Sequence, residues 1–293
     1  MDGTGNDRSK DIANGAETNV SILYGLYDDA DDDRNRPLYY PGVGTDPLTT
    51  VVGGLTGLGG RNRINDALEE IKTNWDGSSI ISVDVFAFSR GSAQALELQN
   101  HILNEGIPGV PAENILINGM FLYDTVGSMG LPGNNIDPGY DLSGSPVVPI
   151  YHATAEHEYR NLFDLQSQRN ADGTMPSNVI EQSFPGAHAG IGGGYAPNEQ
   201  GIPNTLSSIP LQWMHNQAVA AGAPLAPIPE QYQVPPELQT LYNEYRAGNP
   251  VAEETLKENY IHDSRYFWER WLNDEQRSVY YPNQNSAPTT NNP

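Results

Sequence analysis

The pentapeptide Ala87-Phe88-Ser89-Arg90-Gly91 places a serine hydroxyl among small and flexible neighbours. An apolar, β-branched run (80–88) leads into Ser89, and a segment of good helix formers (92–104) follows it. A serine on a sharp strand-to-helix turn is exposed at the sheet edge, and the helix N-terminus directs N–H groups towards a developing oxyanion. The pattern predicts that Ser89 is a nucleophile for acyl transfer. The alternative is a serine that only caps the helix.

A serine nucleophile needs a base to accept its proton and a carboxylate to orient that base. On a strand–turn–helix scaffold of this kind the chain order is Ser, acid, His. His188 follows an apolar run (179–184) in a Gly-rich loop, so we expect it to be the base, with His262 as the alternative. The other histidines are expected to be structural or exposed: His101, His152, His157 and His215.

Asp124 is the expected acid, because it ends an apolar run (115–123) and would stand at the carboxyl edge of the sheet. Glu158 and Asp164 are the alternatives, since an acid after the next strand would serve equally well. A carboxylate that only stabilises a turn is the competing interpretation of Asp124.

An acyl-transfer site also needs two N–H donors for the oxyanion. One is expected to be the amide of Arg90, directly after the nucleophile. The other is expected from Asp2-Gly3-Thr4, with Gly3 and Thr4 as the candidates, because glycine permits close backbone approach.

Strands alternating with helices must position these residues, which predicts an α/β fold of the α/β-hydrolase type, with a mainly parallel central sheet flanked by helices. The expected strands are 38–45, 80–88, 115–123, 147–151 and 179–184. The expected helices are 18–27, 64–75, 92–104, 152–165, 204–221, 236–247 and 251–273.

Composition narrows the classes of protein. With 15 Lys+Arg against 37 Asp+Glu, the formal charge of −22 repels nucleic-acid phosphates and disfavours attraction to anionic membranes. Cysteine is absent, which excludes disulfides and thiolate metal sites. No apolar run approaches the ~18 residues that span a bilayer, so no transmembrane segment is expected.

We expect one α/β domain over residues 1–281, with 130–147 as a loop or lid and 282–293 as a disordered tail. Asp28 to Asp33 is an acidic run that favours a solvated loop over a calcium site, because the Gly and Glu of an EF-hand loop are missing. No metal or cofactor is expected. The first residues lack the basic and apolar regions of a Sec signal peptide.

Six co-linear segments carry a family resemblance: 2–6, 39–45, 87–91, 124–128, 152–163 and 184–195. They are similar to the DGT-x-N, YY-x-GVGT, GFSRG, DTVGS, H-A-x-A-x-D/H-E-x-R-x-x-F and FPG-x-H-x-x-x-GGGY patterns of the DUF2235 family of α/β hydrolases. This family includes the Tle1-like phospholipase effectors of type VI secretion systems. Two departures are expected to matter: Gly190 stands where the family often has Asp, and the strand that usually precedes the DGT pattern is expected to be missing or truncated before Asp2.

The resemblance implies phospholipase A-type hydrolysis of a lipid acyl ester without a cofactor. It also implies a secretion-machinery or immunity partner, and export by a type VI system from the producer cytoplasm into a target-cell periplasm. The departures leave two alternatives open: a weak or inactive hydrolase-fold interaction domain, and an esterase for small esters.

Overall fold

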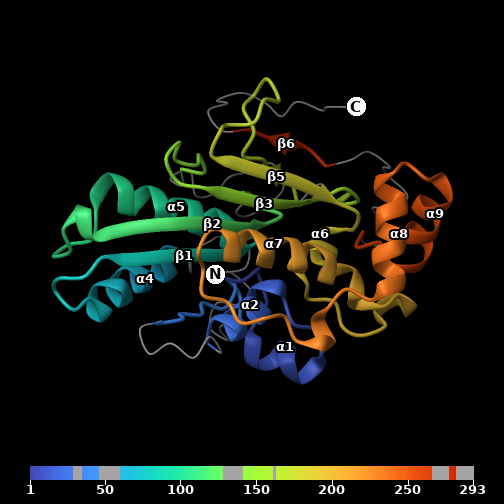
Figure 1. Ribbon diagram of the computed structural model, residues 1–293, viewed down its shortest axis with the longest axis horizontal. Coiled ribbons are helices and arrows are strands. Elements are labelled where there is room, and N and C mark those ends of the chain that lie inside the picture. Colours follow the sequence, from blue (N-terminus) through green and yellow to red (C-terminus); the bar gives the residue numbers. More distant parts are fainter. Residues whose placement is uncertain (29–34, 46–59, 128–140, 161–162, 266–276, 282–293) are drawn as a thin grey trace.

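Four parallel strands form the centre of the computed structural model, which describes residues 1–28, 35–45, 60–127, 141–160, 163–265 and 277–281. The sheet order is β1-β2-β3-β5, with bounds β1 (Ile81–Phe88), β2 (Ile115–Tyr123), β3 (Ile150–Ala155) and β5 (Val179–Phe184) (Figure 1). All three pairings are parallel. The fold is therefore α/β, with a mainly parallel sheet whose carboxyl ends meet at one edge.

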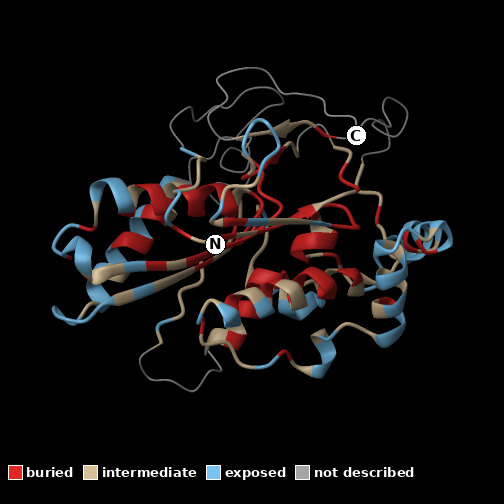
Figure 2. Ribbon diagram, turned by 45° about the horizontal axis from the view of Figure 1, so that its top comes forward, coloured by how far each residue is buried: buried red, intermediate tan, exposed pale blue. Residues whose placement is uncertain are grey.

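Apolar side chains on both faces of the sheet explain why helices cover both of them. On β2, Met120 and Leu122 pack on one face, while Phe121 and Tyr123 pack on the other. The helices α4 (Gly60–Asn74) and α5 (Arg90–Glu105) contribute to the first layer, and α2 (Asn19–Asp28) and α7 (Ser208–Ala220) to the second. Buried residues accordingly concentrate along the strands and the inner sides of these helices (Figure 2). Burial on both faces is typical of parallel sheets.

The remaining elements surround this core. They are α1 (Arg8–Asn14), α6 (His188–Gly192), α8 (Pro236–Arg246), α9 (Pro250–Asn259), β4 (Leu165–Gln166), β6 (Val279–Tyr280) and the 3-10 turns η1 (Ala112–Asn114), η2 (Glu199–Gly201), η3 (Asn204–Ser207) and η4 (Glu230–Tyr232). The short strands β4 and β6 pair with each other in parallel. None of the described helices is long and apolar enough to cross a bilayer.

Most predicted elements are confirmed. The predicted strands 80–88, 115–123 and 179–184 correspond to β1, β2 and β5, and the predicted helices 18–27, 64–75 and 92–104 to α2, α4 and α5. Thr18 caps the N-terminus of α2, because its hydroxyl accepts a hydrogen bond from the Ser21 amide at 3.0 Å. Such a cap satisfies one of the orphan N–H groups of the first turn.

The predicted helix over 152–165 is wrong. Residues from His152 to Ala155 continue β3, which pairs with both β2 and β5, and the described residues after it form a turn and a loop. Hydrogen bonds to β5 over the whole of β3, and to β2 as far as Ala153, satisfy the backbone of this segment, and this outweighs the weak helical spacing of the side chains.

Two smaller predictions also need correction, and two short helices were missed. Residues 38–45 form a loop rather than a strand, although the Tyr40 and Val43 carbonyls accept hydrogen bonds from the Asp2 and Gly5 amides at 2.9 and 3.0 Å. The helix predicted over 251–273 ends at Asn259. The short helices α1 and α6 were not predicted, because each has too few residues to show a helical period.

Several predictions lie outside the described residues. They concern most of the acidic run Asp28 to Asp33, most of the loop or lid 130–147, the end of the predicted helix 251–273 and the tail 282–293.

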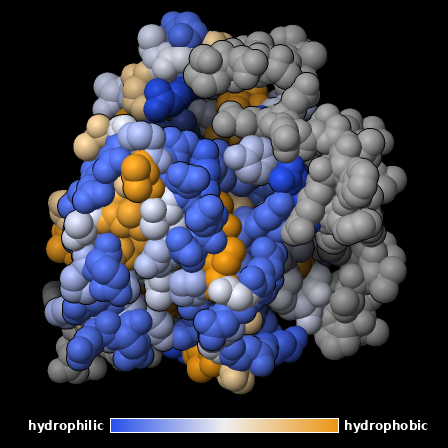
Figure 3. Space-filling view, turned by 90° about the vertical axis from the view of Figure 1, so that its right-hand side faces the viewer, coloured by the Kyte–Doolittle hydropathy of each residue, from blue (hydrophilic) through white to orange (hydrophobic). Residues whose placement is uncertain are grey.

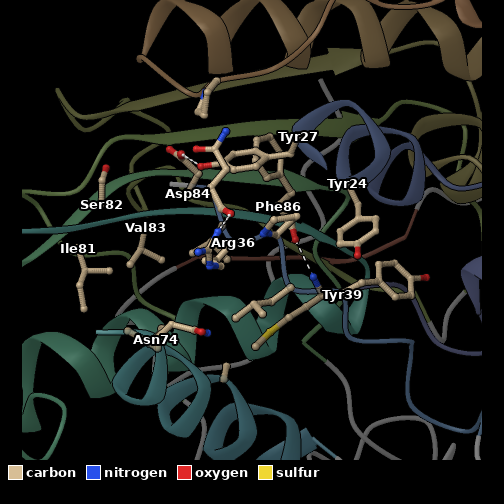
Figure 4. Close-up of a pocket in the computed structure, with 18 of the residues that line it drawn as sticks. Tyr24, Tyr27, Arg36, Tyr39, Asn74, Ile81, Ser82, Val83, Asp84 and Phe86 are labelled. Atoms are coloured by element: carbon tan, nitrogen blue, oxygen red, sulfur yellow. Dashed lines mark hydrogen bonds between the residues drawn. The ribbon is translucent and has the colours of Figure 1, made fainter. Parts of the chain in front are cut away.

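A cavity of about 610 Å³ follows the outer edge of β1, between α2 and α4 (Figure 4). Tyr24, Tyr27, Tyr39, Asp84 and Phe86 are among the residues that line it. At one end of the cavity the backbone of Met1 pairs with β1, because its nitrogen donates to the Phe86 carbonyl at 2.8 Å. Ser89 does not line this cavity, so the cavity is separate from the candidate site described next.

Candidate functional site

Ser89 lies on the sharp turn between β1 and α5, with φ of 60° and ψ of −128°. Residues other than glycine rarely adopt a positive φ, so the backbone of this serine is held in a strained conformation by its surroundings. Its amide donates to the Tyr123 carbonyl at 2.9 Å, which fixes the turn against β2. A Cβ at Gly91 would lie 2.5 Å from the Met1 carbonyl oxygen and 2.6 Å from that of Asp2, so only glycine fits there.

A continuous chain of hydrogen bonds starts at Ser89. Its Oγ lies 2.8 Å from His188 Nε2, and His188 Nδ1 lies 2.6 Å from Asp124 Oδ2. Asp124 follows β2 and His188 begins α6 just after β5, so the three side chains come from the carboxyl ends of three strands. The structure thus brings together the serine, histidine and aspartate that the sequence predicts.

The carboxylate of Asp124 is fully buried and receives hydrogen bonds on both oxygens. Oδ1 accepts from the Ala155 amide at 2.8 Å and from Arg277 Nη2, while Oδ2 accepts from Arg277 Nη1 at 2.7 Å and from His188. Burial alone would raise the pKa of Asp124, but the charge of Arg277 and the hydrogen bonds from His188 and Arg277 hold it well below its ordinary range. Asp124 is therefore an anion throughout the neutral pH range.

Two aromatic rings flank the His188 imidazole, and a second carboxylate, that of Glu158, holds the His188 backbone. Its ring centroid lies 4.6 Å from that of Phe88 and 4.9 Å from that of Phe163. The His188 amide donates to Glu158 Oε2 at 3.1 Å, which fixes the backbone from which the imidazole projects. Burial lowers the pKa of His188 below its ordinary value, against the opposing effect of Asp124, so the imidazole is neutral and able to accept a proton at pH 7.

The Asp-to-Gly departure at residue 190 does not leave His188 without support. Both ring nitrogens and the backbone amide of His188 already have partners in Ser89, Asp124 and Glu158. A Cβ at Gly190 would meet only a methyl carbon of Leu206, at 4.0 Å. A carboxylate at this position is therefore not needed to orient the imidazole.

The alternative acids, Glu158 and Asp164, do not bond to the His188 imidazole, and the alternative base, His262, has a different partner. Glu158 is buried, accepts two side-chain hydrogen bonds from Arg160 at 2.9 and 2.8 Å, and does not contact the imidazole. Asp164 is half-buried, and no described interaction joins it to His188. His262 stacks on Tyr195 with ring centroids 3.8 Å apart.

His152 and His157 have structural hydrogen-bond partners, as expected. His152 Nε2 accepts from the Thr125 amide at 3.1 Å, and its Nδ1 donates to Glu181 at 2.9 Å. The hydrogen bond to the Thr125 amide fixes the residue that follows Asp124, and Asp124 itself has a positive φ of 39°. His157 Nδ1 accepts from the Gly186 amide at 3.1 Å, at the turn that leads to His188. Both histidines therefore brace the loops that carry the site.

The N-terminal loop lies against the same turn. The Asp2 carboxylate accepts from the Gly3 amide at 2.7 Å, the Thr18 hydroxyl at 2.7 Å and the Tyr39 hydroxyl at 2.6 Å. The prediction for Gly3 must be corrected, because an amide already bonded to Asp2 is not available to an oxyanion. The Thr4 hydroxyl, in contrast, is buried without a hydrogen-bond partner among the described residues.

Sequence reasoning missed Arg277, Arg160 and the two rings that flank His188. Arg160 and Phe163 occupy the R and F positions of the E-x-R-x-x-F pattern, so the motif itself contained a signal for them. Arg277 had none, because it lies 153 residues from Asp124 in a segment without any recognisable pattern.

This arrangement is chemically competent for acyl transfer. The imidazole can accept the Ser89 proton on Nε2 while its Nδ1–H remains bonded to Asp124, so the developing imidazolium is stabilised by the carboxylate. The site is largely closed, since Ser89 is 4% and His188 5% exposed.

Comparisons with known proteins agree with this fold. An uncharacterized protein from Pseudomonas aeruginosa has a crystal structure similar to the chain, with a TM-score of 0.63 and 25% identity over 85% of this chain and 50% of that one. The structure of the Tle1 effector bound to the VgrG spike of the type 6 secretion system has a TM-score of 0.62 over 92% of this chain and 81% of that one. At 19% identity, this second likeness shows the fold alone.

Two sequence comparisons differ in extent. An uncharacterized protein of Saccharomyces cerevisiae, YEL023C, is 36% identical over 70 residues, which is 22% of this chain and 10% of the yeast protein. The family model described as T6SS phospholipase effector Tle1-like, catalytic domain, matches residues 1–116 and 104–217, which include Ser89, Asp124 and His188. The chain therefore belongs to the Tle1-like family of type VI secretion phospholipase effectors.

Proposed function

We propose that the protein is a serine hydrolase that cleaves carboxylic esters of phospholipids, with Ser89 as nucleophile, His188 as general base and Asp124 as the orienting acid. The observation that carries this proposal is the unbroken hydrogen-bond chain from Ser89 Oγ through both nitrogens of His188 to Asp124. Family membership supports the lipid substrate.

The reaction has two steps. Ser89 Oγ attacks the ester carbonyl carbon while its proton passes to His188 Nε2, and the tetrahedral intermediate collapses as His188 returns that proton to the departing alcohol. A water molecule then attacks the acyl-enzyme, again losing a proton to His188, and the fatty acid leaves as Ser89 regains its proton. Asp124 remains an anion in both steps.

The oxyanion is bound, in this proposal, by the amides of Thr4 and Arg90. Arg90 begins α5, so its N–H belongs to the positive end of the helix dipole. The Thr4 hydroxyl, which has no hydrogen-bond partner among the described residues, is a third donor and lies on the same N-terminal loop as the Thr4 amide. A low-dielectric, closed site strengthens each of these bonds.

Delivery by a type VI secretion system forms part of the proposal. The family consists of effectors of that system, and the Tle1 effector of the structural comparison is bound to a VgrG spike. We propose a spike protein as partner and phospholipids of a target cell as substrate. Co-purification with the cognate spike protein tests the first of these two points.

Hydrolysis assays test the substrate class. Wild-type protein should release fatty acid from phospholipid vesicles, and Ser89→Ala should lower that rate by about 10³-fold or more, because the nucleophile is lost. Turnover of short esters without release from phospholipids would overturn the lipid assignment alone. No turnover of either substrate would favour an inactive interaction domain and overturn the proposal.

A further inference from the structure

Arg277 comes to the site from the far end of the described chain. It lies two residues before β6, and pairing of β6 with β4 holds this segment beside the residues that follow β3. The Leu165 amide donates to the Ser278 carbonyl at 3.0 Å, next to Arg277 itself. The arginine is thus placed by backbone pairing and not by a flexible surface loop.

The guanidinium group forms a two-pronged contact with Asp124. Nη1 donates to Oδ2 at 2.7 Å and Nη2 donates to Oδ1, so each carboxylate oxygen has its own N–H. The remaining donors reach the Phe163 carbonyl at 2.9 Å and the Ala155 carbonyl at 3.3 Å. Only the planar fork of arginine makes all of these bonds from one position.

The position of Arg277 has an electrostatic consequence. A cation paired with Asp124 disfavours a positive charge on His188. The Arg277 side chain is 4% exposed, so solvent screens its charge little. Within the part of the chain that the structure describes, the other charged groups that act on His188 are Glu158 and Arg160, which pair with each other at 2.8 Å. The described charges at the site therefore form two pairs of opposite sign, Asp124 with Arg277 and Glu158 with Arg160. Their sum is close to zero.

We propose that Arg277 is a positioning residue of the Ser89 site, which holds the Asp124 carboxylate ionised and turned with Oδ2 towards His188. This inference rests on the proposed function. Arg277 touches neither Ser89 nor His188 in any described contact, so it acts through Asp124.

Loss of Arg277 should change the pKa values of both Asp124 and His188 in the same direction. Without Arg277, burial would raise the pKa of Asp124, and below that pKa the carboxyl would no longer be an anion for His188. The loss of a nearby cation would also favour the imidazolium form of His188, which cannot accept the serine proton. Both effects move the loss of activity on the acid side to higher pH.

The pH dependence of kcat/KM for ester hydrolysis tests this in Arg277→Met and Arg277→Lys. In Arg277→Met the acid limb should move up by about one pH unit or more, with KM nearly unchanged. Arg277→Lys keeps the charge but not the fork, so kcat should fall while the limb stays near its wild-type position. Arg169→Met is the control, since Arg169 pairs with Glu181 at 3.0 Å and not with Asp124.

A purely structural role predicts a different result, namely an activity loss of equal factor at every pH with no movement of the limb. That result would overturn the inference. Where Arg277→Met does not fold, Arg277→Lys decides: full wild-type kcat and an unchanged limb would also contradict a need for the fork.

A titration that needs no turnover separates this inference from the proposed function. The imidazole resonances of His188, followed by NMR in Ser89→Ala and in Ser89→Ala/Arg277→Met, should titrate about one unit higher in the second protein. An unchanged titration overturns the inference even where Ser89 is active. A shifted titration in a protein without any esterase activity overturns the proposed function and leaves the coupling between Arg277 and His188 standing.

Discussion

Asp124 and Glu181 illustrate how single buried carboxylates are kept ionised next to histidines. Asp124 relies on Arg277, whereas Glu181 accepts from His152 at 2.9 Å, the Ser167 hydroxyl at 2.8 Å and the Gln168 amide at 2.8 Å. Burial alone would raise the pKa of Glu181, but these hydrogen bonds, above all the one from His152, hold it at about 2. Each carboxylate therefore contributes to stability only while it is ionised.

Ionisation of Glu181 makes the free energy of unfolding depend on pH. Its pKa in the folded protein lies near 2, below the ordinary 4.5, so its contribution is present above about pH 4.5 and is lost as the pH falls towards 2. The difference corresponds to about 3 kcal/mol. Glu181→Gln should therefore be clearly less stable than wild type at pH 6, and this difference should shrink at pH 3, as measured by urea unfolding.

Glu113→Gln is the matched control, because Glu113 is exposed in η1. It should unfold like wild type at both pH values. A Glu181→Gln penalty of the same size at pH 6 and pH 3 would contradict the ionic role assigned to Glu181.

The position of a single side chain could be predicted from the sequence where the residue directly follows a recognisable strand. Ser89, Asp124 and His188 each follow an apolar strand, and parallel strands bring their carboxyl ends to one edge, so their meeting could be predicted. Arg277 could not be predicted, because its position depends on the pairing of two-residue strands. Such strands carry no period in the sequence.

At the scale of elements, the site depends on how closely α5 approaches the N-terminal loop. Gly91 lies in the first turn of α5, against the Met1 and Asp2 carbonyl oxygens. The same loop carries Thr4, so its distance from Ser89 is set by this contact. The prediction of a helix over 152–165 failed at this scale, since pairing with neighbouring strands and not side-chain spacing decided the structure of β3.

Gly91→Ala should impair the site. A Cβ at 2.5 Å from the Met1 carbonyl oxygen forces the loop or the helix to shift, which should lower kcat by about tenfold or more, since displacements of about 1 Å cost large factors in rate. The measurement is kcat for ester hydrolysis, together with the midpoint of thermal unfolding.

Gly190→Ala is the matched control, because it adds the same methyl group in α6, two residues from His188, with no atom of another segment closer than 4.0 Å. Its kcat should stay within about twofold of wild type. Equal activities of the two variants would show that the approach of α5 to the N-terminal loop does not set the geometry of the site.

At the scale of the whole molecule, charge limits how a substrate can approach. The formal charge of −22 opposes long-range attraction to an anionic lipid surface, so contact with a membrane must depend on short-range apolar interactions. The face over α8 and α9 is largely hydrophilic, with separate apolar spots between (Figure 3). Family membership, and not surface composition, is therefore what points to phospholipids.

The extent of the comparisons also matters at this scale. The chain spans 50% of the Pseudomonas aeruginosa protein and 10% of the yeast protein that it matches. Because the chain covers only part of each of these proteins, its proposed activity rests on the hydrogen-bond chain that starts at Ser89.

The most direct measurement is covalent labelling of Ser89. A fluorophosphonate probe reacts with a serine only where a base removes its proton, so intact-mass and peptide mass spectrometry of the labelled protein report the nucleophile itself. We predict one adduct, on the peptide that contains Ser89, and its loss in Ser89→Ala and His188→Ala. An unlabelled wild-type protein, or an adduct on another residue that persists in Ser89→Ala, would contradict the assignment of Ser89 as nucleophile.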